Sequence, residues 1–244
     1  MIIMATFVFV HGAWHGSWCW DKVVSLIQQK GHNAITVDLP CRAGDDTKHS
    51  SVTVNDYAEK ICSVINCQSE PVILVGHSMG GIMISQASEF CSTKIAKLVY
   101  VCAFLPADGQ SLLDLANHET GADAKVLPNL TMDQDNGFSF FDESASLKDI
   151  FYEDCSDADV KRARVMLVPE SLSAFGIPVA LSQEKSFSVP RYYIECEKDR
   201  AIPIALQRHM QEKIKCEKVV TLDASHSPFL SMPKELVDHL ISFI

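Results

Sequence analysis

A serine stands between two glycines at 76–80, Gly-His-Ser-Met-Gly, directly after four apolar residues. The apolar run at 72–75 predicts a short buried strand, and the run at 82–90 is compatible with a helix. In such a sharp strand-to-helix turn the middle residue is strained, and the glycines let the chain pass without Cβ clashes. We therefore expect the hydroxyl of Ser78 to be exposed beyond the strand, as a nucleophile requires.

A serine hydroxyl becomes strongly nucleophilic only when a base removes its proton and an acid orients that base. His226 lies in a loop between the last predicted strand and the last predicted helix, and we interpret it as the base. The acid is expected after the preceding strand, where Asp199 stands. Two alternatives stay open: Glu197 lies closer to the strand end, and Asp223 could brace the histidine loop instead.

Attack on a carbonyl carbon produces an oxyanion that needs two hydrogen-bond donors. The backbone N–H of Met79, directly after the serine, is one candidate. The second is expected in the loop after the first predicted strand, where Ala13 is suitably placed between Gly12 and Gly16. The small glycines allow this loop to approach the serine closely.

Six short apolar runs predict strands, and helix-compatible runs separate most of them: 7–10, 34–37, 72–75, 97–103, 191–196 and 219–222. This alternation is typical of the α/β class, with a doubly wound, mostly parallel six-stranded sheet. Ligands of such sheets bind beyond the carboxyl ends of the strands. Ser78, Asp199 and His226 all follow strands at that edge, so the fold is expected to bring them together.

The segment 107–188 differs in charge from the rest of the chain. It carries 15 acidic and 6 basic residues, whereas the remainder carries 16 acidic and 15 basic residues. We therefore predict two units, a core formed by 1–106 and 189–244 and an insertion at 107–188. Its apolar residues are expected to line a substrate pocket: Leu112, Phe138, Phe140, Phe141, Phe151, Tyr152, Phe175 and Leu181.

The composition excludes several classes of partner and cofactor. A net charge of −10 disfavours nucleic acid and anionic membranes, and no apolar run reaches the roughly 20 residues of a membrane span. The motifs of nucleotide and metal sites are absent, so we expect no cofactor and no metal.

The nine cysteines form no Cys-x-x-Cys pair, and we interpret them as reduced thiols of a cytoplasmic protein. A homodimer is compatible with the sequence.

Four segments together resemble one α/β-hydrolase family, which contains plant methyl esterases, hydroxynitrile lyases and bacterial carboxylesterases of the pyrethroid-hydrolase kind: H-G-A-W-H-G-S-W-C-W at 11–20, G-H-S-M-G-G at 76–81, Y-V-C-A-F-L-P at 100–106 and S-H-S-P-F-L-S-M-P-x-x-L at 225–236. The resemblance implies a cofactor-free enzyme with a mainly helical cap after the fourth strand. It also implies the roles assigned above to five residues: Ser78, His226, Asp199, Ala13 and Met79. One departure is Cys41-Arg42, where this family often has a glycine after Asp-Leu-Pro.

We interpret the chain as a serine carboxylesterase that acts on small, largely apolar esters. The alternatives are a hydroxynitrile lyase and a hydrolase-fold receptor that binds an apolar small molecule with little turnover. In the lyase branch of the resembling family a threonine replaces Gly12 and a lysine replaces Ser227. A lysine there stabilises the departing cyanide anion, and the threonine helps hold the cyanohydrin, whereas Gly12 is expected to leave space for an ester carbonyl.

Overall fold

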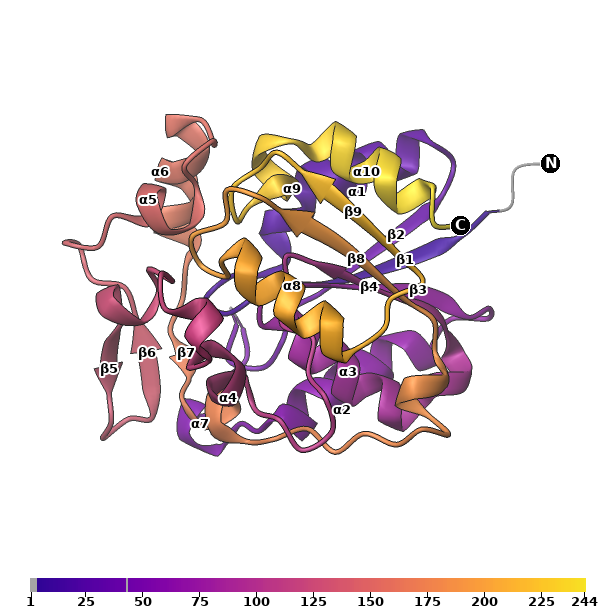
Figure 1. The fold of residues 1–244 in the computed structure, drawn as a ribbon, viewed down its shortest axis with the longest axis horizontal. Helices are drawn as coiled ribbons and strands as arrows, with labels where there is room; N and C mark the ends of the chain where they lie inside the picture. Colours follow the sequence, from indigo (N-terminus) through magenta and orange to yellow (C-terminus); the bar gives the residue numbers. More distant parts are fainter. Residues whose placement is uncertain (1–3, 43) are drawn as a thin grey trace.

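The structure is a computed structural model that describes residues 4–42 and 44–244. Its main sheet has six parallel strands in the order β2-β1-β3-β4-β8-β9 (Figure 1). Each observed strand overlaps a predicted one: β1 (Thr6–Val10), β2 (Asn33–Val37), β3 (Val72–His77), β4 (Ile95–Val101), β8 (Arg191–Cys196) and β9 (Lys218–Leu222). The predicted α/β fold class and the parallel sheet are therefore confirmed.

Helices cover both faces of this sheet, as Figure 1 shows. On one face lie α1 (Asp21–Gln29) and α10 (Pro233–Ile241), and on the other lie α2 (Val54–Asn66) and α3 (Gly80–Cys91). The core is completed by α8 (Ile204–Lys213) and the short α9 (Pro228–Ser231). Among the helices of the described residues, none combines the length and apolar composition needed to cross a bilayer.

Helix α2 begins at a reciprocal hydrogen-bonded cap. The Thr53 side chain accepts a hydrogen bond from the Asp56 N–H, and the Asp56 carboxylate accepts one from the Thr53 N–H. This reciprocal cap satisfies two backbone donors that a helix start otherwise leaves unpaired. The helix then buries one apolar stripe against the sheet and α3: Val54, Tyr57, Ala58, Ile61, Cys62 and Ile65.

Strand β3 lies inside the sheet between β1 and β4, and all six of its residues are buried. A parallel strand covered on both faces is apolar along its whole length, which explains the uninterrupted run Val72, Ile73, Leu74 and Val75. The residue that follows this strand therefore lies in the middle of the carboxyl edge, with loops of neighbouring strands on both sides.

The segment between β4 and β8 contains four α-helices: α4 (Leu112–Ala116), α5 (Leu147–Phe151), α6 (Asp157–Met166) and α7 (Ser173–Gly176). It also contains a three-stranded antiparallel sheet that the sequence analysis did not predict: β5 (Thr131–Asp133), β6 (Phe138–Phe140) and β7 (Glu170–Ser171). Strands of two or three residues are too short to show an alternating pattern. We refer to residues 107–188 as the cap; most of these elements lie beyond the carboxyl edge of the main sheet (Figure 1).

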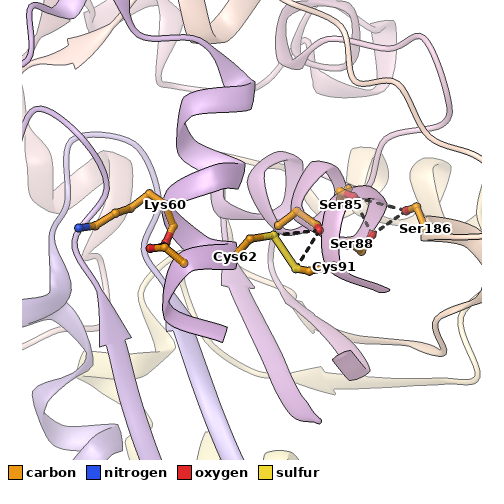
Figure 2. The surroundings of a disulfide bond; sticks show 8 residues. Lys60, Cys62, Ser85, Ser88, Cys91 and Ser186 are labelled. Atoms are coloured by element: carbon orange, nitrogen blue, oxygen red, sulfur yellow. Dashed lines mark hydrogen bonds between the residues drawn. A yellow bond between two sulfur atoms is a disulfide. The ribbon is translucent and has the colours of Figure 1, made fainter. Parts of the chain in front are cut away.

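The prediction that all nine cysteines are reduced is wrong for one pair. Cys62 of α2 and Cys91 at the end of α3 form a disulfide, with their Cα atoms 6.2 Å apart (Figure 2). The two sulfur atoms lie 3.4 and 3.2 Å from the carbonyl oxygen of Ala87. The pair was missed because only the packing of α2 against α3 brings together cysteines 29 residues apart in sequence. The other seven are free thiols: Cys19, Cys41, Cys67, Cys102, Cys155, Cys196 and Cys216.

Candidate active site

Ser78 occupies the turn between β3 and α3, with a backbone φ of 55°. Few residues other than glycine adopt this left-handed region, so the turn is strained in the predicted way. A Cβ atom on Gly76 would lie 2.7 Å from the Gly80 carbonyl oxygen, and one on Gly80 would lie 2.9 Å from the Val10 carbonyl oxygen. The predicted reason for the two glycines is thus confirmed: side chains there would push the turn open.

His226 and Asp199 meet at the carboxyl edge of the sheet. The Nδ1 atom of His226 lies 2.7 Å from Oδ2 of Asp199, and the two side chains are 1% and 0% exposed. The other oxygen of Asp199 accepts hydrogen bonds from the N–H groups of Ala201 and Ile202, at 2.7 and 2.9 Å. These bonds fix the carboxylate, and Nδ1–H of the histidine then donates to it. The second ring nitrogen, Nε2, is left as the proton acceptor.

The two alternatives for the acid do not contact this histidine. Asp223 forms an ion pair with Lys198 at 2.7 Å, and its side chain is 68% exposed. Glu197 is exposed as well. Among these three carboxylates the structure therefore brings only Asp199 together with His226.

His77, next to the serine, packs against the histidine loop. Its Nε2 donates to the carbonyl oxygen of His226 at 2.8 Å, and the centroids of the two imidazole rings lie 4.5 Å apart. Burial is the main cause that lowers the pKa of His77 well below its ordinary value, so this ring is neutral. His77 thus connects the turn that holds Ser78 to the loop that holds His226, in a hydrogen-bonding role.

The loop after β1 presents a free backbone donor to the same space. The N–H groups of Ala13 and Met79 have no acceptor among the described residues, whereas the N–H groups of Trp14 and His15 are both engaged. Ala13, Met79 and Ser78 line one cavity. The approach of this loop is close: a Cβ atom on Gly12 would lie 2.7 Å from Cβ of Ser78.

The cavity that opens on Ser78 lies between the core and the cap, and apart from the Trp14 indole Ser78 supplies its only polar side chain. It is narrow, with a cavity volume of about 50 Å³. Of the eight apolar residues predicted to line the pocket, three do so: Leu112, Phe151 and Phe175. Phe138, Phe140 and Phe141 line a separate hollow on the other side of Trp14.

Only one group of three potential metal ligands lies close together among the described residues: His77, Cys102 and His226, with ligand atoms within 4.8 Å of one another. Each histidine uses one ring nitrogen in the hydrogen bonds described above and keeps the other available. Burial raises the pKa of the Cys102 thiol well above its ordinary value, so it stays protonated. Metal ligation requires a thiolate, so with a protonated thiol this group fits a packed hydrogen-bonded cluster better than a metal site.

Several polar side chains support the loop after β1, and their role was not predicted from the sequence. Glu170 of the cap accepts a hydrogen bond from the Trp14 N–H at 3.1 Å, and Tyr152 bonds Nε2 of His15 at 2.7 Å. Arg42, noted only as a departure from a familiar pattern, forms a buried ion pair with Glu170. In the sequence, only the unusual pair Cys41-Arg42 after Asp-Leu-Pro pointed to this support.

A parallel sheet with a strained serine after an inner strand, and a histidine and an aspartate after later strands, defines the architecture of α/β hydrolases. The chain belongs to the alpha/beta hydrolase family, whose model matches residues 7–239.

Its relatives include esterases. Putative methylesterase 11 of Arabidopsis thaliana, described as chloroplastic, is 31% identical over 94% of this chain, which spans 61% of that protein's length. Methylesterase 7 of the same plant is 30% identical over 94% of this chain and 92% of its own. Among solved structures, a pyrethroid hydrolase from Sphingobium faniae JZ-2 superimposes with a TM-score of 0.87 at 28% identity, covering 98% of this chain and 97% of its own.

Proposed function

We propose that the chain is a cofactor-independent serine carboxylesterase. Ser78 acts as the nucleophile, His226 as the general base, and Asp199 as the acid that orients it. The observation that carries this proposal is the buried hydrogen bond between His226 and Asp199 at the sheet edge where Ser78 stands in its strained turn. The esterases among the relatives support the same reaction class.

The reaction follows from the proton positions. Because Nδ1 of His226 donates to Asp199, Nε2 accepts the hydroxyl proton as the oxygen of Ser78 attacks the ester carbonyl. The oxyanion formed accepts hydrogen bonds from the free N–H groups of Ala13 and Met79. His226 then gives the proton to the leaving alcohol. Water, activated by the same histidine, hydrolyses the acyl-enzyme and restores the serine.

The cavity indicates the kind of ester. Its lining side chains carry no charge, and Ser78 is the only one that can form a strong hydrogen bond. A charged acyl group would lose its hydration there without compensation, so neutral and largely apolar esters fit best. The small free space favours short or flat acyl groups over bulky ones.

No specific observation favours the lyase alternative. The expectation that Gly12 leaves open space for a carbonyl is wrong, because Cβ of Ser78 fills the space beside it. Gly12 instead permits the close approach of the Ala13 loop, and a threonine would require that loop to shift. Ser227 is buried, and it supplies no charge that could stabilise cyanide.

The proposal is tested by trapping and by turnover. We expect a fluorophosphonate to label the wild-type protein at Ser78, and p-nitrophenyl acetate or butyrate to be hydrolysed. A Ser78→Ala variant should do neither. Mandelonitrile is assayed in parallel at equal enzyme concentration. Cyanide release that depends on Ser78 and exceeds ester cleavage would overturn the proposal, and so would a wild-type protein that resists labelling.

A further inference from the structure

Glu170 is a cap residue whose carboxylate is fully buried against the loop that carries Ala13. We propose that Glu170 is a positioning residue: it holds the Trp14 peptide N–H from the cap and so sets the direction of the neighbouring Ala13 N–H, with Arg42 as its counter-ion. This inference rests on the proposed function, because the Ala13 N–H matters only if an oxyanion forms beside it.

The Glu170 carboxylate accepts four hydrogen bonds, and one of them comes directly from the loop that carries Ala13. One oxygen, Oε2, accepts from the Trp14 N–H at 3.1 Å and from Arg42 Nη2 at 2.5 Å. The other, Oε1, accepts from the Tyr57 hydroxyl at 2.5 Å and from the Ser171 N–H at 3.1 Å. A buried carboxylate is retained only when its charge and lone pairs are matched in this way.

Trp14 needs this support because its backbone φ is 62°. The left-handed region is unfavourable for a bulky residue unless the surroundings hold it there. The cap supplies three contacts: Glu170 accepts the N–H, Val168 donates its N–H to the Trp14 carbonyl at 3.0 Å, and Ser139 accepts the indole N–H at 3.2 Å. These contacts fix the peptide that immediately follows Ala13.

Arg42 fixes the other end of the same loop. Its Nε donates to the His15 carbonyl at 2.6 Å, and Nη1 donates to the Pro40 carbonyl at 3.3 Å. Burial alone would lower the pKa of Arg42, but the Glu170 carboxylate and the Tyr57 hydroxyl raise it above its ordinary value. The charged pair therefore holds both sides of the loop and leaves the Ala13 N–H free for a ligand.

A positioning role and a purely structural role differ in their kinetic consequences. A structural ion pair contributes to folding and leaves turnover of the folded molecules intact. A carboxylate that aims an oxyanion donor acts mainly on the transition state, so its loss lowers kcat and leaves KM nearly unchanged. The binding of a transition-state mimic should fall with kcat, because that mimic uses the same donor.

The main experiment compares Glu170→Gln with Glu195→Gln in the full chain. Glu195 is the matched control, since its buried carboxylate also pairs with an arginine, Arg208, but lies on strand β8 away from the Ala13 loop. For Glu170→Gln we expect kcat for a p-nitrophenyl ester to fall by about 30-fold to 100-fold, with KM within about threefold. The Ki of an alkyl trifluoromethyl ketone should rise by the same factor as kcat falls. For Glu195→Gln, kcat and the Ki of the ketone should both stay within about twofold of their wild-type values.

A second variant covers the outcome that Glu170→Gln does not fold because Arg42 loses its partner. Tyr57→Phe removes one hydrogen bond from Glu170 and no charge. We expect this variant to fold, to lose about threefold to tenfold in kcat, and to weaken the trifluoromethyl ketone equally. The amide proton of Trp14, observed by NMR with selective labelling, should change its chemical shift, because the loss of the Tyr57 hydroxyl alters the charge and position of the carboxylate that accepts it.

The results separate this inference from the proposed function. If wild-type protein is not labelled by a fluorophosphonate, the esterase proposal fails, whereas the Trp14 amide shift still reports on the Glu170 contact. If the wild type is an esterase and the variants lose stability but keep kcat and ketone binding, Glu170 is only structural and the inference is overturned.

Discussion

The two walls of the active-site cavity are built by different means. On the core side each proposed reacting group follows a strand of one parallel sheet, and backbone geometry places it, as the φ of 55° at Ser78 shows. On the cap side the elements are short, and the contribution comes from single side chains such as Glu170 and Phe151 that reach the cavity or its loop. In the proposed esterase the core therefore sets the chemistry, and the cap adjusts the loop and the access.

The two walls meet at the loop after β1. Trp14 is held by cap residues through its N–H, its carbonyl and its indole, and His15 is bonded by Tyr152 of the cap. This loop is thus the one part of the proposed oxyanion site whose geometry depends on both units. Changes in the core should affect catalysis or folding. In the cap, a change at Glu170 should affect kcat through this loop, whereas changes to the cavity lining should affect selectivity.

The largest expected effect tests the core wall. Ser78→Ala or His226→Ala should each lower kcat by about 10⁴-fold to 10⁶-fold, because members of such a triad act as one unit. Asp199→Asn should cost about 10³-fold to 10⁴-fold through a misoriented imidazole. Asp223→Asn is the control and should stay within about twofold. An inactive Asp223 variant beside an active Asp199 variant would mean that the acid has been misassigned.

Acid should unfold the core before it affects the cap. Burial is the main cause that lowers the pKa of His15 to about 3, and it also lowers the pKa of His11 and His77. Between pH 6.5 and about 3 the unfolded chain therefore binds more protons, and the free energy of unfolding falls as the pH falls. For His15 alone the loss at pH 5 is about 2 kcal/mol relative to pH 7.5.

Two carboxylates of the cap, Asp133 and Asp142, become protonated at a lower pH than the one at which the buried core histidines begin to reduce stability. Hydrogen bonds from Asn136 and Ser144 lower the pKa of Asp133 and Asp142 below the ordinary value of 3.8, so their contribution is lost only below about pH 4. Urea denaturation at pH 7.5, 6 and 5 measures the core effect. His15→Gln should reduce the drop between pH 7.5 and 5 by about 2 kcal/mol. A stability that is constant over this range would contradict the neutral, buried histidines.

Removing the disulfide should change the stability of the core at a place far from both walls of the cavity. Cys62→Ser with Cys91→Ser opens a loop of 29 residues, which should lower the free energy of unfolding by about 3 to 4 kcal/mol. The kcat should stay within about twofold, because the bond joins α2 to the far end of α3. Cys67→Ser, at an exposed free thiol, is the control for thiol loss. A large fall in kcat would show that the core and the site are coupled through α3.

Most of the core could be predicted because its strands and helices carry their own signals. The run Val72 to Val75 is apolar without a break, and Thr53 with Asp56 marks a helix start by local hydrogen bonds. The choice between Asp199 and Glu197 could not be settled, since they differ by two positions in one loop. Only the structure shows which carboxylate faces the histidine.

The cap could not be predicted to the same depth because its key contacts are long-range. Glu170 lies in a strand of two residues, and its partners Arg42 and Tyr57 are 128 and 113 positions away in sequence. Nothing near Glu170 in sequence distinguishes it from the other acidic residues of this segment, most of which face water. Likewise, an apolar residue of the cap gives no sign of whether it lines the cavity or the separate hollow beyond Trp14.

The difference between cap residues that line the cavity and those that line the separate hollow gives a prediction with the smallest expected effect. Leu112 of α4 lines the cavity at Ser78, whereas Phe138 of β6 lines the separate hollow. Leu112→Ala should enlarge the cavity and raise kcat/KM for a hexanoate ester about tenfold relative to an acetate ester, since a few methylene groups gain room to bind. Phe138→Ala is the matched control, because it also removes a large apolar cap side chain but should leave this ratio within about twofold. The ratio of the two p-nitrophenyl esters, measured in the same preparation, removes errors in active-enzyme concentration. A shift in the ratio with Phe138→Ala and none with Leu112→Ala would assign selectivity to the other hollow and contradict the role of Leu112.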